Sequence, residues 1–251
     1  MEFCLWQRDY NLRASDFDKF NHVKPSAVLD LFLDATEQHA EVLGVGYDSM
    51  IKHSYYWVLV RIKFQIISHP KRYQKVIVKT WPRVLNRSNY RREYCIEDQD
   101  GEILVIGSSE WLVVSNAKRI PRIVMDSDFF NFSNRFYPLI YFESNLDRVQ
   151  DFKTRRLPYM VPLGFCDLGV KNQINNTKYA DYVVDALDPD ASEEIELFQI
   201  DFRNKVKPGV MAIYHKKKDE FILAKGQNED GETIFACKLK YKQPTSCQHS
   251  Q

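Results

Sequence analysis

The chain has 251 residues, of which 44% are hydrophobic and 27% are charged, as in ordinary soluble globular proteins. Its formal net charge of +1 excludes a global attraction to nucleic acid or to an anionic membrane, so a charged partner must be recognised by a local patch. The five cysteines are scattered without metal-ligand spacing and no apolar run could span a bilayer; we therefore expect a cytoplasmic protein without cofactor, metal site or membrane span.

The first half of the chain predicts a strand, a long helix and four further strands, in that order. Residues 2–12 alternate loosely in polarity and are expected to form the first strand. Pro25 suits the start of a helix that Gly44 can end, and the apolar residues near its start predict deep burial. Four runs rich in β-branched and aromatic residues follow, and Asp100-Gly101 marks a hairpin between the last two. These runs cover 55–67, 73–81, 89–98 and 102–114.

The second half repeats this order after a connection without periodicity. Residues 117–158 contain prolines and charges, and are expected to link one domain at 1–116 to another at 159–251. In the second domain we expect a strand at 159–168, a helix at 175–187 and four further strands. These strands cover 193–206, 209–217, 219–227 and 232–242.

An internal repeat relates the two halves. When residues 16–28 are set above residues 167–179 without gaps, at an offset of 167 − 16 = 151, Asp16 lies over Asp167. Both segments lie immediately before the long helix of their half. One helix wrapped by an antiparallel sheet in the order β-α-β-β-β-β is typical of the hotdog fold. The sequence therefore predicts an α+β double hotdog, with two such units in tandem.

The second segment resembles the C-terminal motif of the acyl-ACP thioesterases of bacteria and plants, D-L-D-x-N-x-H-V-N-N-x-x-Y. The matching residues are Asp167, Leu168, Asn175, Asn176 and Tyr179. The resemblance extends through the first half in the segments ATEQHAEVLGVG, KTWPR, SNYRREY, EWLVV and RIPR. It implies a double hotdog that hydrolyses the thioester between a fatty acyl group and acyl carrier protein.

Inert residues occupy the catalytic positions of that motif. The motif's Asp, Asn and His correspond to Gly169, Lys171 and Gln173, and the family's catalytic Glu corresponds to Lys205. A positioned acid or base contributes about 10²–10⁴ in rate, so we expect little catalysis of the family's type in the second half. The two neighbouring asparagines of the motif remain. They are expected either to bind substrate or carrier, or to cap and pack the helix start.

The equivalent loop of the first half keeps ionisable side chains. Its sequence DFDKFNHV resembles the D-x-D-x-x-G-H-V loop of 4-hydroxybenzoyl-CoA-type thioesterases, whose second Asp is catalytic. That position is Asp18, while His22 lies over Gln173 and Phe20 takes the place of the Asn. We expect Asp18 to act as general base or nucleophile and His22 to orient water or polarise the carbonyl, with Glu37 as a supporting carboxylate. The alternative is that they are ordinary residues of an exposed loop.

A basic surface is expected to receive the carrier, because acyl carrier protein is acidic. One group of basic residues gathers near a predicted hairpin and consists of Arg83, Arg87, Arg91 and Arg92. A second basic run is formed by residues 216–218. Either group is a candidate docking site, and the alternative is that both are solvated faces without a partner.

Three functions remain open from the sequence. The first is a hydrolase that releases free fatty acid from acyl carrier protein, with its chemistry in the first half. The second is a non-catalytic member of the family that binds acyl chains or acyl-ACP. The third is an acyl-CoA thioesterase of the 4-hydroxybenzoyl-CoA type, which the DFDKFNHV loop favours. Hotdog sheets often associate edge to edge, so a homodimer is one candidate assembly, and the sequence does not fix the oligomeric state.

Overall fold

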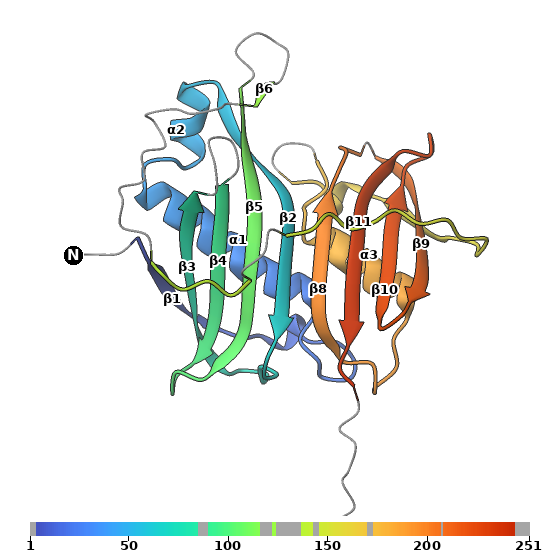
Figure 1. Ribbon diagram of the computed structural model, residues 1–251, viewed down its shortest axis with the longest axis horizontal. Helices are drawn as coiled ribbons and strands as arrows, with labels where there is room; N and C mark the ends of the chain where they lie inside the picture. The colour runs from blue at the N-terminus through green and yellow to red at the C-terminus, as the bar shows by residue number, and fades with distance from the viewer. Residues whose placement is uncertain are drawn as a thin grey trace, which may run out of the picture.

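One antiparallel sheet runs through both halves of the chain, and two helices lie against one of its faces (Figure 1). The computed structural model describes residues 4–84, 90–115, 122–123, 137–142, 146–169, 173–206 and 208–243. The first half contains β1 (Trp6–Asn11), α1 (Pro25–Val42), α2 (Tyr47–Lys52), β2 (Tyr55–Ile66), β3 (Lys75–Val84), β4 (Tyr90–Asp98), β5 (Ile103–Ser115) and β6 (Arg122–Ile123). The second half contains β7 (Tyr159–Leu163), α3 (Lys178–Leu187), β8 (Ile195–Phe202), β9 (Gly209–Lys218), β10 (Phe221–Gln227) and β11 (Thr233–Tyr241). None of the helices in these ranges is long and apolar enough to cross a membrane.

The strand order places the two halves side by side in this sheet. It runs β1-β3-β4-β5-β2-β8-β11-β10-β9-β7, with β6 paired to β5. β2 and β8 join the halves in antiparallel register, from Arg61 opposite Asp201 to Gln65 opposite Leu197. A helix packed on each half of a shared antiparallel sheet confirms the predicted double hotdog (Figure 1).

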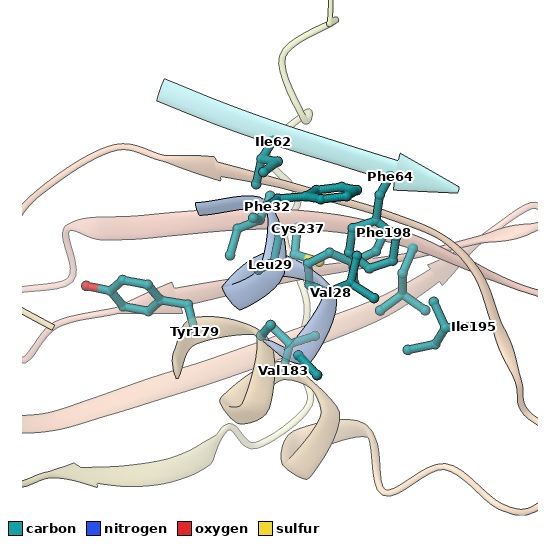
Figure 2. Close-up of a cluster of buried hydrophobic side chains, with 14 of the residues drawn as sticks. Val28, Leu29, Phe32, Ile62, Phe64, Tyr179, Val183, Ile195, Phe198 and Cys237 are labelled. Atoms are coloured by element: carbon teal, nitrogen blue, oxygen red, sulfur yellow. The ribbon is translucent and has the colours of Figure 1, made fainter. Parts of the chain in front are cut away.

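A continuous core lies between the helices and the sheet. α1 begins at Pro25, whose missing N–H suits the first turn of a helix. Phe32 of α1 stacks on Tyr94 of β4 with the ring centroids 4.4 Å apart. Across the joint between the halves, the rings of Phe64 and Phe198 stack at 5.5 Å. Figure 2 shows core residues from both helices and the sheet, among them Val28, Leu29, Ile62, Tyr179, Val183 and Cys237. The two halves therefore share one hydrophobic core.

Two described parts of the connecting segment, 137–142 and 146–152, cross the outer face of the sheet, opposite the helices (Figure 1). We call them the strap. Asp201 on β8 accepts a backbone N–H of the strap at 2.8 Å, and Glu110 on β5 accepts another at 3.1 Å. Because these carboxylates belong to different halves, the strap ties both halves together and covers charged side chains on this face.

Two predicted boundaries in the second half are wrong. The strand predicted at 159–168 ends at Leu163, and the helix predicted from 175 begins at Lys178. The residues between this strand and this helix form a loop closed by its own backbone hydrogen bonds. The loop is therefore longer at both ends than the sequence predicts. α2 was not predicted, because its six residues are too few for helical periodicity to be recognised.

Candidate functional site

Two loops whose described ends carry matching hydrogen bonds precede α1 and α3. We call residues 16–24 the N-loop and residues 167–175 the C-loop; positions 170–172 lie outside the described residues. Each loop follows a short 3-10 helix and is closed by an isolated β-bridge. The matching backbone hydrogen bonds are Asp18 N–H to His22 O (2.9 Å) with Gly169 N–H to Gln173 O (2.8 Å), and Lys24 N–H to Asp16 O (2.9 Å) with Asn175 N–H to Asp167 O (2.9 Å). These pairs confirm the ungapped alignment at an offset of 151.

The N-loop fixes the carboxylate of Asp18. Its Oδ1 accepts the backbone N–H groups of Phe20 and His22, each at 2.8 Å. Asn21 adopts a left-handed conformation with φ 69°, and this conformation makes the tight turn possible. Asn tolerates it better than most residues. Oδ2 of Asp18 lies 3.7 Å from Nδ1 of His22, and both side chains are half-buried. The structure thus brings the predicted pair Asp18 and His22 together.

A second histidine, His69, completes this cluster. Its ring centroid lies 6.0 Å from that of His22, and its Nε2 contacts the carboxylate of Glu194 in the other half. Nδ1 of His69 is buried and has no hydrogen-bond partner among the described residues. With Nε2 facing a carboxylate, a neutral imidazole carries its proton there and leaves a lone pair on Nδ1. We call Asp18, His22, His69 and Glu194 the N-loop cluster.

His69 is the first-half counterpart of Lys205. The N–H groups of Ile67 and Ser68 both donate to Leu104 O, at 2.8 and 3.1 Å. In the second half the N–H groups of Arg203 and Asn204 both donate to Ile234 O, at the same two distances of 2.8 and 3.1 Å. The next residues are His69 and Lys205. The three positions predicted to be inert, Gly169, Gln173 and Lys205, therefore have Asp18, His22 and His69 as their first-half counterparts.

Burial and the surrounding charges set the state of His69. Burial lowers the pKa of the His69 imidazole, and the carboxylate of Glu194 partly opposes this effect. Lys242, which follows β11, lies 3.5 Å from Glu194 and further favours the neutral imidazole. His69 is therefore neutral at neutral pH, which is the form that can accept a proton. In the described part of the chain no group of three or more His, Cys, Asp or Glu side chains could hold a metal ion.

The remaining predicted site residues lie elsewhere. Glu37 is exposed on α1, roughly 18 Å along the helix from Pro25 at 1.5 Å per residue, and its role as a supporting carboxylate stays a prediction. Asn175 is exposed, with its side chain 3.4 Å from the Thr177 N–H, and Asn176 is half-buried. Both precede α3 rather than lying within it. Lys171 lies outside the described residues.

Two of the four arginines in the predicted basic surface at the β3–β4 hairpin are buried. The side chain of Arg91 pairs with Glu93 at 2.8 Å beneath the strap, while Arg92 faces α1 on the other side of the sheet. Their exposed fractions are 2% and 7%, so neither can receive a carrier and the prediction of docking there is wrong for both. Arg83 lies 3.8 Å from the buried Glu93 carboxylate, and Arg87 lies outside the described residues.

Burial of His39 next to Arg92 makes stability depend on pH. Arg92 donates to Nδ1 of His39 at 2.9 Å, and burial together with this charge lowers the pKa of His39 to about 3. Since unfolded His titrates near 6.5, stability is complete above that pH and is lost as pH falls towards 3, by about 1.4 kcal/mol per pH unit. We expect His39→Gln to remove this slope between pH 6.5 and 5 in urea unfolding. An unchanged slope would contradict a neutral buried His39.

Comparison with known proteins adds the family context. A family model described as the acyl-ACP thioesterase N-terminal domain matches residues 4–130. A palmitoyl-acyl carrier protein thioesterase of Cuphea hookeriana is 22% identical over 211 residues, which cover 77% of this chain and 49% of that protein. The chain spans about half the length of the curated relatives it matches.

Solved structures agree with the double hotdog. An acyl-ACP thioesterase from Bacteroides thetaiotaomicron superposes with a TM-score of 0.85 at 15% identity, covering 95% of this chain and 98% of that one. The 12:0-ACP thioesterase from Umbellularia californica gives a TM-score of 0.83 at 19% identity, covering 96% and 98%. At these identities the likeness establishes the fold, and the chemistry must be argued from the side chains.

Proposed function

Because the chain belongs to the acyl-ACP thioesterase family, we propose that it hydrolyses acyl-ACP thioesters at the N-loop cluster. One observation carries this proposal. Where the C-loop side has Gly169, Gln173 and Lys205, the equivalent positions hold Asp18, His22 and His69 in mutual proximity. The family's reaction needs a positioned base, and the first half supplies one at each equivalent position.

In this mechanism His69 is the general base. Glu194 orients the ring and stabilises the imidazolium. Nδ1 is buried before substrate binds, so binding of the thioester must uncover it; Nδ1 then takes a proton from water as the water oxygen attacks the thioester carbonyl carbon. The tetrahedral intermediate then breaks its carbon–sulfur bond, and the departing thiolate receives the proton from His69. The products are the free acid and the carrier thiol.

Asp18 and His22 have supporting roles at the same place. His22 is held by the Asp18 carboxylate and directs its ring towards the attacking water or the carbonyl oxygen. The N-loop runs directly into α1, so the positive end of the α1 dipole adjoins the cluster and favours the developing oxyanion. This mechanism does not use the positions of the family's C-terminal catalytic motif.

The test is free-thiol release by the wild-type protein from a panel of acyl-ACP and acyl-CoA thioesters of different chain lengths. We expect saturable turnover with preference for acyl-ACP, and no change in Lys205→Ala, because the C-loop side is inert. Preference for acyl-CoA would favour the 4-hydroxybenzoyl-CoA type of thioesterase. Acyl binding without turnover of any thioester would contradict the proposed hydrolysis and leave a binding protein.

A further inference from the structure

A basic hollow lies at the edge of the second half, away from the N-loop cluster. It has a volume of about 370 Å³ and six lining residues, five of them cationic. The cations are Lys153, Arg155, Arg156, Lys216 and Lys217, and all five are exposed. No acidic side chain lines the hollow. Five positive charges in one concavity are a strong local feature on a chain whose net charge is +1.

The fold builds this hollow by leaving one edge of β9 without a partner strand along 214–218, among the described residues. β7 pairs with β9 from Leu163 opposite Gly209 to Tyr159 opposite Ile213, and goes no further. Among the described residues no strand covers 214–218 on that side. The segment 153–156 lies there instead, so its cations face those of β9 across the hollow.

Apolar side chains adjoin the charges. Leu157 is 93% exposed, and Tyr159 and Met160 at the start of β7 are 46% and 54% exposed. Large apolar side chains in such a group, rimmed by charge, are typical of protein–protein contact surfaces. A free phosphate or nucleotide would use the cations without needing the apolar neighbours, so the combination favours an acidic protein.

The hollow and the N-loop cluster lie at the same end of the sheet. β9 ends at Lys218 and β8 begins at Ile195, one residue after Glu194. Lys217 is in register with Ile222, Leu239 and Phe198 on successive strands. Three strand spacings, about 14 Å in all, therefore separate Lys217 from Phe198 on β8.

We propose that this basic hollow docks the acidic surface of an acyl carrier protein. The inference rests on the proposed function for the identity of the partner, and it places the carrier at the end of the sheet where its thioester would be hydrolysed. The exposed cations steer the carrier towards the hollow, and the exposed apolar side chains beginning at Leu157 contact it once it is bound.

The test is fluorescence anisotropy of labelled holo acyl carrier protein titrated with the full chain. We expect Lys216→Glu with Lys217→Glu to weaken binding by roughly tenfold or more at low salt, and the difference to shrink as salt screens the charges. The matched control is Lys71→Glu with Arg72→Glu, an equal charge change in the exposed loop between β2 and β3, which should bind like the wild type.

Each outcome separates this inference from the proposed function. Equal binding by the Lys216/Lys217 variant and the wild type would overturn the docking site, even if the protein hydrolyses acyl-ACP. Displacement of the carrier by coenzyme A alone, or no binding at low salt, would also overturn it. Binding that depends on the hollow without any turnover would support docking and contradict the proposed hydrolysis.

Discussion

We expect His69→Gln to lower kcat/KM for an acyl-ACP thioester by about 10²–10⁴, the usual contribution of a positioned general base. Glutamine can still donate a hydrogen bond to Glu194, so the local packing is kept, but its side chain has no basic nitrogen. The loss should therefore occur without a change in unfolding free energy beyond that of an ordinary substitution. Steady-state thiol release and urea unfolding of the same preparations measure both quantities.

The matched control for His69 is His53→Gln. His53 is an exposed histidine after α2, and its substitution should leave kcat/KM unchanged. In the wild type the acid limb of the pH–rate profile should lie below about 6.5, because burial lowers the pKa of His69 below its ordinary value. Full activity of His69→Gln would place the base elsewhere.

Asp18→Asn tests the contribution of the Asp18–His22 pair to the N-loop cluster. Asparagine keeps an oxygen that can accept the N–H groups of Phe20 and His22, and removes the charge that faces the His22 ring. A loss of activity with the loop intact would show that the charge matters. Unchanged activity would leave Asp18 as a purely structural residue of the turn.

The sequence could predict the N-loop but not its partners. Asp18 and His22 are four positions apart in a recognisable local pattern, and the repeat offset transfers their geometry to Gly169 and Gln173. His69 and Glu194 are 194 − 69 = 125 residues apart, and meet because β2 and β8 pair across the two halves. Counting from the ends of those strands would have found His69, since it stands where the second half has Lys205.

The hairpin arginines show a different limit. Charged residues in a sequence are usually expected to be exposed to solvent. Arg91 and Arg92 are neighbours on β4, so their side chains point to opposite faces of the sheet. Both faces are covered here, one by α1 and the other by the strap. The covering of the outer face depends on where the connecting segment runs, which no local periodicity predicts.

The largest expected effect on stability comes from breaking the ion pair between Arg91 and Glu93 beneath the strap. Glu93 and Arg91 are fully buried, 2.8 Å apart, and both contact Ser108. Burial raises the pKa of Glu93, and the Arg91 charge opposes the shift and favours the carboxylate. We expect Glu93→Ala to lower the unfolding free energy by about 3–5 kcal/mol, because it removes a buried counter-charge 2.8 Å from the Arg91 guanidinium. Urea unfolding measures this, and a loss below about 1 kcal/mol would contradict it.

The double variant Arg91→Met with Glu93→Leu separates charge from packing. Replacing both members of a buried pair by apolar residues of similar volume is often neutral, because the cost of desolvating the two charges disappears with them. We therefore expect the double variant to regain most of the stability lost in Glu93→Ala. Arg91 also donates to the Phe142 carbonyl of the strap, so that contact is lost in the double variant. A double variant as unstable as Glu93→Ala would mean that the strap contact, rather than the ion pair, dominates at this position.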